Sequence, residues 1–241
     1  MVGWLSSLLA HRHLATAAVS RLIAVGDIHG CLAALDALLD VVEPRPEDTL
    51  VMLGDYIDRG PDSCGVLERL IELADRCTLV PLLGNHEEMM LATLDNAAPV
   101  GWWRTHGGGE TLRSYDDRSD SRGLLERHTA WLRDCPAWHE ADDWFFTHAN
   151  YVADEPLASQ PAEALRWESL AMHFPSRHLS GKRAVVGHTA QRSGEVLWAD
   201  QLVCIDTHCY GGGWLTALDT TSGQIWQSSR SGRLRADAPA G

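Results

Sequence analysis

The chain has 241 residues, of which 45% are hydrophobic and 22% charged, as is typical of a globular protein with a buried core. Its formal net charge is −13, so we expect neither nucleic acid nor an anionic membrane as a partner. The 6 cysteines form no Cys-x-x-Cys pair, which favours a cytoplasmic protein with reduced, buried thiols over a disulfide framework.

A single domain is expected over residues 1–241. Residues 1–20 are mostly apolar but are interrupted at 11–13 by His, Arg and His, which excludes a signal-peptide core and a membrane span. We expect an N-terminal extension there, in the form of an amphipathic helix. Residues 229–241 are rich in Ser, Gly, Arg and Ala and lack apolar periodicity, which predicts a disordered tail.

The first part of the chain predicts three strand–loop–helix units. Apolar runs predict strands at 22–26, 49–53 and 77–83. Helical spacing of apolar residues predicts helices over 32–42, 64–74 and 87–96. Three such units in succession indicate a parallel α/β sheet that binds ligands at the carboxyl ends of its strands.

The middle of the chain, residues 95–141, is polar and poor in strand signal, and we expect a helical or loop insertion over the site there. For Trp102 and Trp103 we favour core or lid packing over a substrate groove, and for Gly107–Gly109 a flexible turn. Later short apolar runs predict an antiparallel sheet packed on the first one as a sandwich: 143–147, 184–186, 196–198, 202–205, 214–218 and 224–227.

Four short stretches place Asp, His or Asn directly after apolar runs: Gly26–Gly30 (GDIHG), Gly54–Gly60 (GDYIDRG), Gly84–Glu87 (GNHE) and Gly187–Thr189 (GHT). Oxygen and imidazole ligands at the mouths of strands suit a two-metal hydrolytic site. The predicted ligands are Asp27, His29 and Asp55 for one ion, and Asp55, Asn85, His148 and His188 for the other. Asp55 can bridge because a carboxylate has two oxygens. The mixed nitrogen and oxygen set favours Mn, with Fe or Zn as alternatives, over Mg or Ca.

Neighbours of these ligands predict the handling of a phosphate group. Arg59 can hold two phosphate oxygens at once. His86 is not needed as a ligand; when protonated it can donate to the leaving oxygen, and Asp58 can keep its imidazole charged. Taken singly, such Asp and Asn residues are more often helix caps, and strand-end histidines such as His148 and His188 more often make structural hydrogen bonds. The four stretches taken together favour metal ligands over these structural roles.

The ordered motifs GDIHG, GDYIDRG and GNHE resemble the signature of the phosphoprotein phosphatase family of dinuclear metallophosphoesterases. The similarity is to its bacteriophage lambda protein phosphatase type and covers roughly residues 22–218. It implies a calcineurin-like α/β fold, in which a β-sandwich of mixed sheets is flanked by helices. It also implies two divalent metal ions, one-step phosphomonoester hydrolysis by a metal-bridging water, and the residue roles assigned above.

Two further positions are compared with that family. Its second phosphate-binding arginine usually stands in a Trp-x-Arg-Glu context, and here the segment reads Leu-Arg-Trp-Glu, so Arg166 is our candidate although it is one position out of step. His208 stands where a glycine often follows Asp-Thr, so its side chain is a candidate for contacting the substrate.

We therefore predict a metal-dependent serine/threonine protein phosphatase, with dual specificity left open, that acts on a phosphorylated protein or peptide as a monomer. The alternative is a symmetrical dinucleoside-tetraphosphate hydrolase of the same superfamily. Such relatives often carry Gln at the position of His29, which favours the phosphatase. A non-catalytic phosphate-binding module is disfavoured because the chain lacks none of the expected ligands.

Overall fold

Buried strands from the first part of the chain form one side of the first sheet. The computed structural model describes residues 20–116 and 118–236, so the predicted N-terminal helix lies outside the described residues. The parallel strands are β1 (Leu22–Val25), β2 (Thr49–Met52) and β3 (Thr78–Pro81). Each is followed by a helix, α1 (Leu32–Val42), α2 (Ser63–Leu73) and α3 (Asn85–Leu94), which confirms the three predicted units.

The last two strands complete this same sheet. Strand β9 (Trp214–Asp219) pairs antiparallel with β1, and β10 (Ile225–Ser229) pairs antiparallel with β9, which makes the order β10-β9-β1-β2-β3. The prediction that the second half of the chain forms its own antiparallel sheet was therefore wrong. Alternation within a strand indicates which face is buried, but it carries no information on which strand lies beside it.

The second sheet has the order β4-β5-β6-β8-β7. Its strands are β4 (Trp138–Ala141), β5 (Trp144–Thr147), β6 (Arg183–Val186), β7 (Leu197–Trp198) and β8 (Leu202–Cys204). Strands β5, β6 and β8 are parallel, and only the edge strands β4 and β7 are antiparallel to their neighbours. Both sheets are thus mixed, as the predicted fold class requires.

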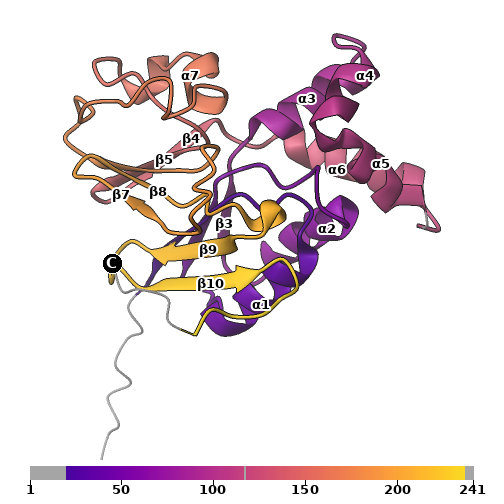
Figure 1. Ribbon diagram of the computed structural model, residues 1–241, viewed down its shortest axis with the longest axis horizontal. Coiled ribbons are helices and arrows are strands. Elements are labelled where there is room, and N and C mark those ends of the chain that lie inside the picture. Colours follow the sequence, from indigo (N-terminus) through magenta and orange to yellow (C-terminus); the bar gives the residue numbers. More distant parts are fainter. Residues whose placement is uncertain (1–19, 117, 237–241) are drawn as a thin grey trace, which may run out of the picture.

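The two sheets pack on each other as a sandwich, with helices on the outer sides (Figure 1). One apolar cluster joins Val51 and Leu53 of the first sheet region to Phe146 and Val185 of the second. A larger cluster lies between the first sheet and its helices, and a third covers the outer face of the second sheet. Burial of these three apolar layers is the main force that holds the strand ends of both sheets in place.

The predicted insertion is mostly helical. It contains α4 (Val100–Trp103), a wide turn η1 (Arg104–Gly108), α5 (Gly109–Asp116) and α6 (Ser121–Arg133), which gather with α3 at the upper right of Figure 1. Its last residues form strand β4, which sequence analysis missed because Trp138–Ala141 shows no apolar alternation.

The glycine run Gly107–Gly109 is not the flexible turn that we predicted. Gly107, with φ 110°, lets η1 continue into α5, and a Cβ there would lie 2.7 Å from the main-chain nitrogen of Arg59. A Cβ on Gly108 would lie similarly close to the indole of Trp103. Trp103 is buried, as predicted, whereas Trp102 is 38% exposed. The run therefore serves close packing of the insertion against the loop that carries Arg59.

The remaining described segments include η2 (Leu157–Ser159), α7 (Ala162–Arg166) and η3 (Cys209–Gly211). Residues 229–236, which we expected in a disordered tail, are held by contacts: Arg235 pairs with Glu195 and donates to Gln227; residues 237–241 lie outside the described part. The cysteines are free, and all but Cys135 are buried. Across residues 20–116 and 118–236, no helix has the length and apolar character that crossing a membrane requires.

Candidate metal centre

The loops after five strands bring most of the predicted site residues together. Asp27 and His29 follow β1, Asp55 to Arg59 follow β2, and Asn85 and His86 begin α3 directly after β3. His148 follows β5 and His188 follows β6, so both sheets contribute. These loops all leave the carboxyl ends of parallel strands, where open α/β sheets bind ligands.

The backbone of these loops is strained. His29, Asp55, Asp58, Arg59 and His188 all have positive φ, between 46° and 72°, a region that non-glycine residues rarely adopt. Gly54 before Asp55 has φ 101°, and a Cβ on it would lie 2.9 Å from the imidazole Nδ1 of His148. Strain of this kind concentrates at functional sites, where the surrounding structure holds side chains in one orientation.

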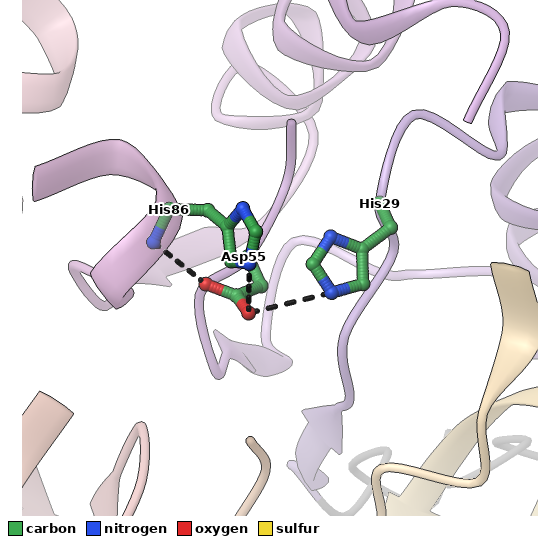
Figure 2. Close-up of side chains that lie close together, drawn as sticks. All are labelled: His29, Asp55 and His86. Carbon is green, nitrogen blue, oxygen red and sulfur yellow. Dashed lines mark hydrogen bonds and ion pairs between the residues drawn. The ribbon is translucent and has the colours of Figure 1, made fainter. Parts of the chain in front are cut away.

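Asp55 lies at the centre of the group, and its two oxygens face different histidines. Its Oδ2 is 3.4 Å from Nε2 of His29 and 3.9 Å from Nε2 of His86 (Figure 2). Its Oδ1 is 3.4 Å from Nε2 of His148, and that oxygen also accepts the main-chain N–H of His86. Two groups of potential ligand atoms result, His29–Asp55–His86 and Asp55–His148–His188, and they share Asp55.

Three histidines are oriented by main-chain carbonyl groups. Nδ1 of His29 is 2.9 Å from the carbonyl oxygen of Ile57, and Nδ1 of His148 is 2.7 Å from that of Leu53. Nε2 of His188 is 3.1 Å from the carbonyl oxygen of Trp167. In each ring the nitrogen beside the carbonyl must carry the proton, so the other nitrogen keeps its lone pair for a ligand.

Asn85 joins the second group. Its Oδ1 lies 3.0 Å from Nε2 of His148 and 3.1 Å from Nδ1 of His188. Asp27 is placed differently: it accepts the main-chain N–H of His188 at 3.0 Å, and its oxygens belong to neither tight group of ligand atoms. The first group thus contains His86, which we did not predict as a ligand, and does not contain Asp27.

The electrostatics of the site favour a cation. Burial, together with the charges of Asp206 and Asp55, raises the pKa of Asp27 well above its usual range, and burial raises the pKa of Asp55 to about 8. Burial lowers the pKa of His148 to about 4 and that of His188 to about 3, which keeps both rings neutral. Buried carboxylates beside neutral imidazoles are stabilised by a bound divalent cation, because the cation favours the charged carboxylate. The donor set therefore fits divalent metal ions.

Asp206 was not assigned a role from the sequence, although the Asp-Thr pair was noticed. It is 3% exposed, and burial raises its pKa to about 6. Its charge is one of the causes that raise the pKa of Asp27 and Asp55, so it adds a further negative charge to this side of the centre. The signal that could have identified it is its position two residues after the apolar run of β8.

His86 and Asp58 form the predicted pair, and the insertion supports it. Nδ1 of His86 is 2.6 Å from Oδ2 of Asp58. The indole N–H of Trp103 donates to the same carboxylate at 2.9 Å, and the hydroxyl of Thr111 donates to its Oδ1 at 2.6 Å. Sequence analysis missed both donors, because they come from residues 45 and 53 positions further along the chain.

Arg59 lies beside the first group. Its Nη1 is 2.7 Å from Nε2 of His29, and its guanidinium lies over the ring of Tyr210 at 4.6 Å. Tyr210 in turn contacts His29, with ring centroids 4.9 Å apart. The arginine is thus held next to the centre by an aromatic ring that the sequence did not indicate.

Arg166 and His208, the two predicted substrate contacts outside the main motifs, belong to neither group of potential ligand atoms. Arg166 donates from Nε to Glu88 at 2.6 Å, and the indole of Trp167 donates to the same carboxylate at 2.9 Å. His208 packs its ring on Tyr210 at 4.8 Å and lies directly over Gly211, away from the groups of ligand atoms. Substrate contact by either residue therefore stays a prediction.

Comparison with known proteins places residues 20–212 in the family described as calcineurin-like phosphoesterase. A curated relative, the symmetrical bis(5'-nucleosyl)-tetraphosphatase of Nitrosomonas europaea, is 31% identical over 180 residues, which cover 74% of this chain and 60% of that protein. The enzyme of the same name from Burkholderia pseudomallei is 33% identical over 146 residues, 60% of this chain and 48% of that protein. The chain thus spans about half to three fifths of the length of these relatives.

Solved structures support the same fold. A structure described as a "putative diadenosine tetraphosphatase" superimposes with a TM-score of 0.64 at 24% identity and covers 88% of this chain and 94% of its own. At that identity the likeness shows the fold alone.

The predicted protein serine/threonine phosphatase is contradicted by these relatives, which are named as tetraphosphatases. The motifs behind that prediction contain the candidate ligands and the candidate phosphate-binding residues, which any phosphate hydrolysis at a metal centre needs. The ring of His29, which we took to favour the phosphatase, contacts Asp55, Arg59 and a main-chain carbonyl of the centre itself. The lambda-type assignment is likewise not supported.

Proposed function

Because the chain belongs to the calcineurin-like phosphoesterase family, we propose that it is a metal-dependent hydrolase that splits dinucleoside tetraphosphates symmetrically into two nucleoside diphosphates. The observation that carries the proposal is the arrangement of Asp55, whose two oxygens face two separate histidine groups. The names of the curated relatives supply the substrate class.

The residues that would hold two divalent ions are His29 and Asp55 on one side, and Asp55, Asn85, His148 and His188 on the other; Asp27 completes the first set in our assignment. Bound ions would supply Lewis-acid activation of water and neutralise phosphate charge. We favour Mn, with Fe or Zn as alternatives, because the donor set mixes imidazole nitrogen with carboxylate and amide oxygen.

The chain's own residues position the phosphate and move a proton. Arg59 is fixed over Tyr210 and can bind two phosphate oxygens beside the centre. His86, when protonated on both nitrogens, donates from Nδ1 to Asp58 and can donate from Nε2 to the departing oxygen. Burial lowers the pKa of His86 well below its usual range, so the charged imidazole depends on Asp58, whose carboxylate Trp103 and Thr111 hold in place.

The test is a product analysis with the purified, Mn-loaded chain and diadenosine tetraphosphate. We expect ADP as the only nucleotide product by ion-exchange chromatography. Production of AMP and ATP, or turnover of a phosphopeptide but not of the dinucleotide, would contradict the proposal.

A variant tests the role of His86. His86→Asn should lower kcat by about 10²-fold, the low end for a general acid, because a diphosphate leaves more readily than an alkoxide. Bound metal, measured by elemental analysis, should stay at the level of the parent protein. His173→Asn, at an exposed histidine, is the matched control and should leave kcat unchanged.

A further inference from the structure

Two tryptophans form an aromatic pair at the edge of the candidate centre. The rings of Trp102 and Trp167 lie 6.1 Å apart between centroids, and their planes are inclined by only 21°. Trp102 belongs to α4 of the insertion and Trp167 follows α7, so their contact joins separate parts of the chain. Trp102 is 38% exposed, so part of its ring is open to solvent.

The pair is tied to the centre through Trp167. The main-chain oxygen of Trp167 is 3.1 Å from Nε2 of His188, one of the potential ligands. Its indole N–H donates to Glu88, which also accepts from Arg166, so an arginine is fixed beside this aromatic pair. A molecule stacked on Trp102 would therefore lie next to Trp167, whose main chain contacts the ligand group.

A second arginine and aromatic ring lie beside the first ligand group. Arg59 lies over Tyr210, which contacts His29, and a cavity there is lined by Arg59, Arg104, His106 and Tyr210. His106 also packs on the ring of Trp102, with centroids 5.7 Å apart, so Trp102 lies next to this cavity. A nucleobase on Trp102 would therefore lie between the cavity at Arg59 and the ligand group of His188.

We propose that one nucleobase of the substrate stacks on Trp102, which itself packs on Trp167. The inference rests on the proposed dinucleoside-tetraphosphate hydrolysis and adds the residue that recognises the nucleoside. Indole rings stack on every base, so Trp102 would favour a nucleoside over a bare phosphate but would not distinguish one base from another. In a chain of net charge −13, Arg59 beside the centre offers the positive charge that a polyanionic substrate needs, whereas Arg166 is paired with Glu88.

The test compares three variants of the full, Mn-loaded chain with two substrates. Trp102→Ala should lower kcat/KM for diadenosine tetraphosphate about 10-fold or more, mainly through KM. Trp102→Phe should restore most of it, because the phenyl ring still stacks. Trp198→Ala is the matched control, since Trp198 is 40% exposed on the edge strand β7. With inorganic tripolyphosphate, which carries no aromatic ring, all three variants should match the parent protein.

The result that overturns the inference is a Trp102→Ala variant that behaves like Trp198→Ala with the dinucleotide, or that loses tripolyphosphate hydrolysis equally. A calorimetric titration with ADP gives a second readout, and Trp102→Ala should weaken ADP binding by a similar factor. If the parent protein hydrolyses tripolyphosphate but not the dinucleotide, the proposed function fails. ADP binding that depends on Trp102 would then still support base stacking at this residue, and ADP binding that does not depend on Trp102 would refute it.

Discussion

Glu87 is the residue whose replacement tests most directly how the fold presents Asp55. Its carboxylate is fully buried and accepts four main-chain N–H groups. Oε1 accepts from Tyr56 at 2.8 Å and Ile57 at 3.2 Å, and Oε2 accepts from Asp55 at 2.9 Å and Gly84 at 3.1 Å. Both oxygens are therefore occupied as acceptors, and the loop after β2 is held to the start of α3.

Glu87→Gln keeps the size of the side chain but leaves one oxygen as an acceptor. The amide NH₂ would then face two N–H donors, so two charge-assisted hydrogen bonds, each worth about 1.5–3 kcal/mol, are lost. The neutral amide also avoids the cost of burying a charge, a cost that raises the pKa of Glu87 to about 8, and this offsets part of the loss. We expect the free energy of unfolding to fall by about 3 kcal/mol.

The assay is equilibrium urea unfolding of the parent protein, Glu87→Gln and a control, each freed of metal by a chelator. Glu163→Gln is the control, because Glu163 is exposed on α7 and its side chain makes no hydrogen bond within the described residues. A Glu87→Gln variant as stable as Glu163→Gln would refute the reasoning, because the four accepted N–H groups would then not be what holds the Asp55 loop.

Two further predictions concern Gly187 and Asp48. A Cβ on Gly187 would lie 2.2 Å from Oδ1 of Asp27, so Gly187→Ala should displace that carboxylate and lower the bound metal measured by elemental analysis, while Gly101→Ala, in open space, should not. Burial alone would raise the pKa of Asp48, but hydrogen bonds from Arg21 and Arg45 outweigh it and hold the pKa below its usual range. The carboxylate therefore stabilises the fold at a pH above its unfolded pKa, and this contribution is lost as the pH falls through the lower folded pKa. Asp48→Asn should lower the free energy of urea unfolding by about 2 kcal/mol at pH 7 and by progressively less below about pH 4. A loss of stability that does not change with pH would contradict this.

Much of the candidate centre could be predicted because its residues stand at the ends of apolar runs. A glycine followed by Asp, His or Asn after a buried strand is a local pattern, and the parallel arrangement carries each such side chain to the same edge. Asp55, Asn85 and His148 were found in this way, and the structure brings them within hydrogen-bonding distance or close to it.

The substrate could not be predicted from the sequence, because the motifs contain only the candidate metal ligands and phosphate-binding residues. Trp102, which packs on Trp167, and Tyr210, which lies under Arg59, belong to no motif, so the motifs carry no information on what lies beyond the phosphate. That is why the same pattern led to a protein phosphatase, while the curated relatives are dinucleotide hydrolases.

The sequence by itself determined the fold class and most of the strands and helices, and it placed candidate metal ligands at strand ends, because periodicity and strand-end residues act over a few positions. The tertiary structure alone decided that β9 and β10 join the first sheet, that Trp103 and Thr111 hold Asp58, and that Trp102 meets Trp167. These contacts join distant segments through hydrogen bonds and ring packing that leave no periodic trace in the chain, so only the folded arrangement reveals them.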